Sequence, residues 1–382
     1  MFENMQRGPV DPMFDLKKVA DNDTSPEKVD LGVGIYRNEE GYYHEMEVLK
    51  VAKKTLNERN PGHDYECTTG SPEFLKRAAQ VMFGEKSQAL RSGRVASVQT
   101  ISGTGANHLA ALLLSKCEGS QAGSVYIGTP AWGNYEPLCS LVGLKVVRYP
   151  YYDPETATVN FKVLLETVTQ APPNCVFILQ GCCHNPTGVD LSKSQWKQLA
   201  AAMKNARCFP FMDIAYQGLG SSMEDDAYGI RLFAEMEFEM LVCQSFSKNL
   251  GLYGERCGAL HVVCSSSTAA TNVYDQLRCL IRWEFSSSPL YGARLADIIL
   301  KSSSLQASWS VLSSQSALSL ISDTLNRSTE LSDMRQRLLN NRKQLFEALQ
   351  DVPRNWDVIL ATKGLFWCEL SLSKTFMDFG LY

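Results

Sequence analysis

A lysine at the end of an apolar run is the first residue in this sequence that needs a chemical explanation. The segment SFSKNLGLYGERCG, residues 245–258, places Lys248 shortly after the apolar run EMLVCQ. Lysine is almost never fully buried without a partner or a task. A desolvated lysine has a lowered pKa and can form a Schiff base with an aldehyde, so Lys248 is a candidate nucleophile.

Two parts of the sequence are suited to an anion such as phosphate. Ser245 precedes the lysine and Arg256 follows it, and arginine forms bidentate pairs with phosphate oxygens. Earlier in the chain, ISGTGANHL leads from an apolar run into a helix, where free backbone N–H groups attract anions. Gly103 and Thr104 of that turn, with Ser245 and Arg256, are predicted to enclose a phosphate. A plain strand-to-helix turn is the structural alternative for the glycines.

Polar and aromatic residues follow other apolar runs in the same way. Asp213, after CFPFM, is expected to be buried with a positive partner or hydrogen bonds, unless it is a helix N-cap. Asn185 in HNPTG places an amide at the mouth of a sheet, unless the segment is a simple reverse turn. Trp132 in TPAWGNY offers a flat face to a planar ligand, unless it is a core residue. Tyr216 lies just beyond Asp213.

Together these side chains describe one ligand, pyridoxal phosphate, which has an aldehyde, a phosphate, a basic ring nitrogen and a phenolic oxygen. Lys248 is predicted to bind the aldehyde, and Asp213 to keep the ring nitrogen protonated so that the ring accepts electrons. Asn185 and Tyr216 are predicted to meet the phenolic oxygen, and Trp132 to stack on the ring. The sequence therefore predicts a pyridoxal-phosphate-dependent enzyme.

The elements that must position these residues alternate along the chain. Short β-rich runs are predicted at residues 95–100, 124–129, 175–180, 208–213 and 239–244. Helical stretches separate several of them, which indicates an α/β fold with a mainly parallel sheet. In such sheets, sites form beyond the carboxyl ends of the strands, where the residues above fall. Residues 316–350 carry apolar positions at helical spacing and predict one or two long amphipathic helices.

The composition is that of an ordinary soluble enzyme and argues against several classes of protein. The 382 residues suffice for a large domain with a smaller companion. The net charge of −4 and the lack of a dense Lys/Arg block argue against a nucleic-acid partner. No run of eighteen apolar residues predicts a membrane span. The acidic N-terminal segment predicts a cytoplasmic protein, and twelve scattered cysteines without a C-x-x-C pair predict no metal site.

Seven segments resemble, in order, successive blocks of the aspartate aminotransferase family, the class-I, fold-type I, pyridoxal-phosphate-dependent aminotransferases. They are KVDLGVGIYRNEEG, DYECTTGSPEF, SGTGA, PAWGNY, HNPTG, DIAYQG and SFSKNLGLYGERCGAL. The resemblance covers nearly the whole chain and implies a mainly parallel sheet in a large domain plus a smaller α+β domain made of both chain ends. The implied boundaries are an N-terminal arm at 1–12, a small domain at 13–42 and 316–382, and a large cofactor-binding domain at 43–315.

The resemblance also implies an activity and further site residues. Lys248 is implied to be the catalytic residue of a ping-pong aminotransferase that acts on an aspartate- or glutamate-like L-amino acid and a 2-oxo acid. Ser102 is implied to join the phosphate site. Tyr65 is implied to reach the phosphate of the partner subunit, so the resemblance implies a homodimer.

Four contacts to the substrate follow from the resemblance. Gly34 and Trp132 match positions that touch substrate, and Asn185 is implied to serve both cofactor and substrate. Arg282, in IRWEFSSSP, matches the arginine that crosses the dimer to bind the distal carboxylate of a dicarboxylate.

The chain departs from the family at several positions. Tyr135 and Gln180 stand where the family has histidines that support the aspartate binding the ring, and this change is expected to retune Asp213 without abolishing its role. Trp283 and Glu284 are expected to add bulk and a negative charge that neutralises Arg282. The chain stops before the C-terminal arginine that holds the substrate α-carboxylate, so a truncated sequence is expected.

These departures leave alternatives to the dicarboxylate aminotransferase. One is a diverged biosynthetic aminotransferase for a non-dicarboxylate keto or aldehyde substrate. Another is a different pyridoxal-phosphate reaction, such as β-elimination or decarboxylation, since the residues around the cofactor do not select the reaction. A third is a cofactor-binding paralogue with weak or no transaminase activity.

Overall fold

The structure, a computed structural model, divides the chain into two compact units. It describes residues 1–8, 12–28, 30, 34–117, 124–310, 329–353 and 356–365, without the side chains of residues 12–14. One unit comprises Met1–Ile35 and Glu369–Tyr382, and the other comprises Tyr36–Cys368. The domain boundaries proposed above stay a prediction, and much of the predicted small domain (316–328, 354–355 and 366–382) lies outside the described residues.

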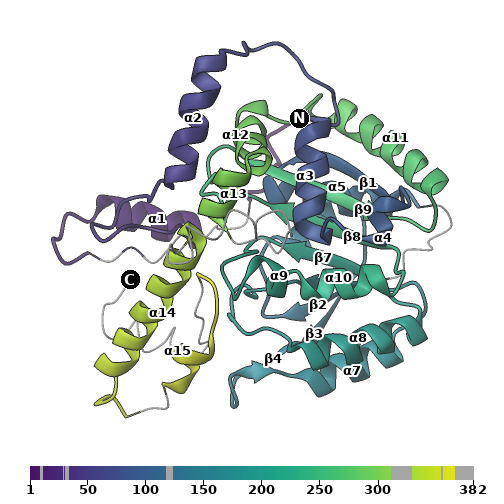
Figure 1. The fold of residues 1–382 in the computed structure, drawn as a ribbon. Helices are drawn as coiled ribbons and strands as arrows, with labels where there is room; N and C mark the ends of the chain where they lie inside the picture. The colour runs from purple at the N-terminus through teal and green to yellow at the C-terminus, as the bar shows by residue number, and fades with distance from the viewer. Residues whose placement is uncertain are drawn as a thin grey trace. The chain divides into compact units, whose positions relative to one another are not determined.

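A seven-stranded sheet forms the centre of the larger unit (Figure 1). Its strands are β1 (Val95–Ile101), β2 (Val125–Thr129), β3 (Val146–Pro150), β6 (Val176–Gln180), β7 (Phe209–Ile214), β8 (Met240–Ser245) and β9 (Cys257–Val263). Their order is β1-β9-β8-β7-β6-β2-β3, and neighbours are parallel except where β9 pairs with β8 and β1. The five β-rich runs predicted from the sequence are confirmed. A short ribbon of β4 (Tyr152–Asp153) and β5 (Thr158–Val159) stands apart.

The sheet separates two hydrophobic cores because side chains alternate across a strand. In β6, Val176 and Ile178 belong to one core, and Phe177 and Leu179 belong to the other. Strands covered on both faces read as continuous apolar runs, which explains runs such as CVFILQ and EMLVCQ. The mainly parallel α/β fold is confirmed.

Helices cover both faces of this sheet (Figure 1). On one face lie α5 (Ser102–Ser115), α6 (Tyr135–Leu141) and α11 (Ser267–Glu284). On the other lie α3 (Pro72–Phe83), α7 (Phe161–Gln170), α8 (Lys193–Ala206), α10 (Tyr228–Glu235) and α12 (Leu290–Lys301). The remaining helices are α1 (Pro12–Asn22), α2 (Glu47–Arg59), α4 (Gln88–Arg91), α9 (Met223–Asp226), α13 (Ser303–Trp309), α14 (Glu330–Ala348) and α15 (Asp357–Ala361).

The long helix predicted within residues 316–350 is found as α14, which begins after an N-cap at Thr329. Leu331 and Met334 are buried, as the helical spacing predicts, but Leu339 and Leu345 are exposed. The apolar stripe therefore covers only the first turns of the helix, and residues 316–328 lie outside the described part. None of the described helices is long and apolar enough to cross a bilayer.

One edge of the sheet collects the segments that matter for function. β1, β6, β7 and β8 run in the same direction, so their carboxyl ends meet there. β9 runs the opposite way and begins at this edge, with Cys257 opposite Ile101. Arg256, just before β9, thus reaches the edge from which Lys248 emerges. The sequence did not predict this antiparallel strand.

Candidate active site

A cavity at this edge brings together the ten residues predicted from chemistry or resemblance to surround the cofactor within one chain. They are Ser102, Gly103, Thr104, Trp132, Asn185, Asp213, Tyr216, Ser245, Lys248 and Arg256. Asn107, Tyr135, Gln180, Cys182, Ala215 and Ser247 complete the lining. Residues from widely separated parts of the chain meet because each lies at or just beyond a strand end.

Lys248 lies in the loop after β8 with much of its side chain buried. Burial lowers the pKa of its ammonium group, and neighbouring Arg256 acts in the same direction, whereas Asp213 opposes them. The Nζ atom lies 5.3 Å from the centre of the Tyr216 ring. A lysine with a lowered pKa has more of the neutral amine that attacks a carbonyl carbon.

Asp213, near the end of β7, is a buried carboxylate with one oxygen bonded and one bare. The Tyr135 hydroxyl donates to Oδ2 at 2.6 Å, and Oδ1 has no hydrogen-bond partner among the described residues. Burial raises the pKa of Asp213 to about 6, although Tyr135, Asn107 and Lys248 pull it down. A bare buried carboxylate oxygen fits a cationic N–H group, such as a protonated pyridine nitrogen.

The start of α5 forms an anion site with the residues around Lys248. The Ser102 hydroxyl hydrogen-bonds to the Ser245 hydroxyl at 3.1 Å and to the Ser247 hydroxyl at 2.6 Å. A Cβ on Gly103 would lie only 3.1 Å from the Ser245 Cβ, so glycine keeps this turn open. The guanidinium of Arg256 donates to the Tyr253 carbonyl at 2.8 Å. Hydroxyls, an arginine and a helix N-terminus together suit a phosphate.

Asn185 and Tyr216 form the wall on the Gln180 side of the cavity. Gln180 Nε2 donates to the Asn185 carbonyl at 3.0 Å, and the Asn185 amide donates to Gln180 Oε1 at 2.7 Å. Burial raises the pKa of Tyr216 well above its usual value, and a hydrogen bond with the Asn185 side chain acts in the opposite direction. The Gln180 side chain therefore forms two hydrogen bonds with the backbone of Asn185, and these fix the position of Asn185 in the cavity wall.

The two residues that replace histidines have separate roles. Tyr135 contacts Asp213. Gln180 pairs with Asp213 in the sheet, but its side-chain amide bonds the backbone of Asn185.

Two further lining residues were missed in the sequence. Ser247 lies within the segment already singled out, between Ser245 and Lys248. Asn107 lies one helical turn beyond Gly103 and donates to its carbonyl at 2.9 Å, so i to i+4 spacing was the available signal.

Of the residues implied by resemblance alone, Ser102 lines this cavity, whereas Tyr65 and Arg282 are not among its lining residues. Tyr65 is 87% exposed, and Gly34 belongs to the other compact unit. Arg282, near the end of α11, is exposed and donates to the Ser286 hydroxyl at 2.7 Å. Glu284 Oε1 contacts His108 Nε2 at 3.1 Å, and whether Glu284 neutralises Arg282 stays a prediction.

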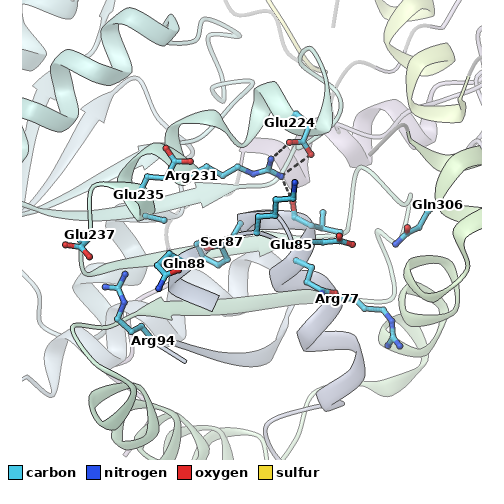
Figure 2. Close-up of a pocket in the computed structure, with 16 residues that line it drawn as sticks. Arg77, Glu85, Ser87, Gln88, Arg94, Glu224, Arg231, Glu235, Glu237 and Gln306 are labelled. Atoms are coloured by element: carbon cyan, nitrogen blue, oxygen red, sulfur yellow. Dashed lines mark hydrogen bonds and ion pairs between the residues drawn. The ribbon is translucent and has the colours of Figure 1, made fainter. Parts of the chain in front are cut away.

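A larger hollow lies between α3, α4 and α10 (Figure 2). Arg231 donates there to Glu224 and to the backbone carbonyls of Val81 and Met82, and Arg77 pairs with Asp297. These contacts hold neighbouring helices together, so the hollow lies where these helices pack against one another. It contains none of the residues predicted to do chemistry.

Comparisons with known proteins agree on one family. The family model described as aminotransferase class I and II matches residues 26–375. The aminotransferase tasG of Hapsidospora irregularis is 47% identical over 299 residues, 78% of this chain and 79% of that protein. The mitochondrial aspartate aminotransferase of Dictyostelium discoideum is 38% identical over 379 residues, covering 98% of this chain and 84% of that protein.

A solved structure shares the fold. The aromatic-amino-acid aminotransferase from Burkholderia pseudomallei, covalently bound to pyridoxal phosphate, matches with a TM-score of 0.87 and 36% identity. The match covers 95% of this chain and 87% of that chain. The fold-type I architecture expected from the sequence is thereby confirmed.

Proposed function

Because this chain belongs to the class I and II aminotransferases, we propose that the cavity around Lys248 is its active site. The family makes it a pyridoxal-phosphate-dependent enzyme that transfers an amino group between an amino acid and a 2-oxo acid. The observation that carries the assignment is the bare, buried Oδ1 of Asp213 in the same cavity as a lysine whose pKa burial has lowered.

Each side of the cavity suits one part of the cofactor. Lys248 Nζ is proposed to bind the aldehyde, and Asp213 to hold the proton at the ring nitrogen. Trp132 is proposed to cover a face of the ring, with Asn185 and Tyr216 at the phenolic oxygen. The phosphate is assigned to Ser102, Gly103, Thr104, Ser245 and Arg256.

The reaction then divides between cofactor and protein. Bound there, pyridoxal phosphate supplies an electron sink that stabilises negative charge on the amino-acid α-carbon. Lys248 is proposed to move the proton at that carbon, since its burial keeps part of the amine neutral. The amino group would stay with the cofactor after the first 2-oxo acid leaves, so the two half-reactions would follow a ping-pong order, with Lys248 serving in both.

A dicarboxylic amino acid, aspartate- or glutamate-like, is the proposed donor. Arg282 supports this because it is exposed and donates to a neutral partner, Ser286, while Glu284 contacts His108. A non-dicarboxylate substrate is the second candidate. The 74% exposed Trp283 beside Arg282 favours it, since an apolar side chain there suits an apolar substrate.

The site is proposed to be completed in a homodimer. Tyr65 and Arg282 are both exposed and project from elements outside the cavity, which suits residues that serve a second copy of the chain. Gly34 is proposed to contact substrate. A cytoplasmic location is also proposed, since the cysteines of the described residues are free thiols, as a reducing compartment maintains them.

Turnover by purified protein tests the proposal. With cofactor and a 2-oxo acid, the wild type is expected to consume aspartate or glutamate, and Lys248→Ala to be slower by at least about 100-fold. Lys197→Ala, at an exposed lysine of α8, is the matched control and is expected to keep the wild-type rate. A Lys248→Ala protein as fast as wild type would contradict the assignment, and turnover of phenylalanine alone would favour the second substrate class.

A further inference from the structure

We propose that Tyr135 is a positioning residue that holds Asp213 in its ionised form and fixes Trp132 across the same cavity. The inference rests on the proposed cofactor site. The Tyr135 hydroxyl donates to Asp213 Oδ2, and we assign to it the task of keeping this buried carboxylate ionised and ready for a cation.

The placement of Tyr135 follows from the short turn after β2. Trp132 lies in this turn, and the Tyr135 amide donates to the Trp132 carbonyl at 3.2 Å as α6 begins. The two rings meet edge to face, with centres 5.2 Å apart and planes at 85°. Such pairs contribute stabilisation beyond the area they bury. One side chain therefore contacts both residues proposed to hold the cofactor ring.

The hydroxyl of Tyr135 is aimed at a single acceptor. It donates to Asp213 Oδ2 at 2.6 Å, and only 2% of the tyrosine is exposed. A hydrogen bond to an ionised group is stronger than one between neutral groups, so the bond favours the carboxylate over the acid. It also occupies Oδ2, which leaves Oδ1 to face the cavity.

The other titratable groups facing Asp213 come from three places. Lys248 follows β8 and favours the carboxylate, Cys243 lies on β8, and Tyr216 follows β7. Burial and the Asp213 charge raise the pKa of Tyr135 well above that of an ordinary tyrosine. The phenol therefore stays protonated across the working pH range and donates throughout, while Asp213 is the group that titrates.

Replacing Tyr135 by Phe isolates the hydroxyl, because the ring and its contact with Trp132 remain. Asp213 would then lose the donor at Oδ2 and would favour its protonated, neutral form more than in the wild type. Neutral Asp213 cannot balance a protonated ring nitrogen. Cofactor affinity should fall, and it should begin to fall at a higher pH than in the wild type.

The experiment measures the dissociation constant of pyridoxal phosphate against pH by protein fluorescence, without turnover. Tyr135→Phe is expected to weaken binding by about 10- to 100-fold at pH 7 and to move the acid limb of the profile upward. Tyr149→Phe is the matched control, since Tyr149 is equally buried but lies against Gly128. Unchanged binding and pH profile in Tyr135→Phe would overturn the inference.

A double-mutant cycle separates positioning from general loss of structure. If Tyr135 acts through Asp213, adding Tyr135→Phe to Asp213→Asn should change the dissociation constant by less than about twofold. An effect as large as in the wild-type background would show that the hydroxyl acts by another route and overturn the inference. Failure of the proposed function gives a different result: the wild type itself would not bind the cofactor, or Lys248→Ala would bind it in the same covalent form.

Discussion

Burial of Asp213 lowers the free energy of unfolding at neutral pH. The folded protein disfavours the ionised carboxylate, whereas the unfolded chain leaves it in water. Burial raises its pKa from the ordinary 3.8 to about 6. A carboxyl group whose pKa is higher in the folded state contributes stability below its unfolded pKa and loses it as pH rises through the folded value. In the cofactor-free protein at pH 7, this loss amounts to roughly 2–3 kcal/mol.

Asp213→Asn is therefore expected to stabilise the cofactor-free protein while abolishing tight cofactor binding. The gain in the free energy of unfolding should be larger at pH 8 than at pH 5 by about 1 kcal/mol, because the wild type becomes ionised between them. Urea denaturation at both values measures it, with Asp351→Asn, at an exposed aspartate, as the control. A gain that is the same at both pH values would contradict the titration of Asp213.

At this scale the sequence predicted which residues meet but not all of their contacts. Asp213 and Lys248 were predictable because polar residues directly after buried runs need a task. The separate roles of Tyr135 and Gln180 were not, since the resemblance marks both only as replacements of histidines and does not show which atoms they contact. Which atom each side chain reaches depends on rotamers that only the packed site selects.

At the scale of the elements, strand β9 closes one side of the anion site, because it begins directly after Arg256 and runs beside the start of α5. Its glycine, Gly258, lies so near α5 that a Cβ there would be 2.6 Å from the Ser102 carbonyl carbon and 2.7 Å from the Gln244 carbonyl oxygen. Both are backbone atoms, which cannot rotate away. The strand escaped prediction because a short apolar run directly after a loop has no period that distinguishes strand from helix.

Gly258→Ala is expected to destabilise the protein by about 1–3 kcal/mol and to weaken phosphate binding, because α5 must shift from the strand. The midpoint of thermal unfolding and the affinity for pyridoxal phosphate measure the two effects. Gly254→Ala is the matched control, since a Cβ there meets nothing within 4 Å of the described structure. Equal stability of the two variants would show that α5 and β9 are not held as tightly as described.

For the molecule as a whole, the proposed dimer predicts that two inactive variants complement each other when they form a mixed dimer. Lys248→Ala and Arg282→Ala homodimers should each be slow. In a mixed dimer, one site combines an intact Lys248 with the partner's intact Arg282 side chain. Refolding an equal mixture should recover part of the wild-type turnover of a dicarboxylate, up to about one quarter if chains pair at random. No recovery in a verified mixed dimer would contradict sharing of the site.

The fold class was predictable from the sequence because alternation of strands and helices is a local signal that survives in each segment. Domain boundaries are harder, because they depend on which distant parts of the chain pack together. Residues 13–42 and 316–382 were assigned to one domain, but no local pattern in either segment shows which distant part it packs against. The two compact units of the structure divide the chain differently, near Ile35 and Cys368.

Identification of the lysine that carries the cofactor tests the central claim most directly. The protein is incubated with pyridoxal phosphate, reduced with borohydride, digested, and its peptides are mapped by mass spectrometry. We expect one modified peptide, containing Lys248, and no modification of Lys248 when the cofactor is omitted. Modification of another lysine in its place, or of none, would contradict the assignment of this cavity as the active site.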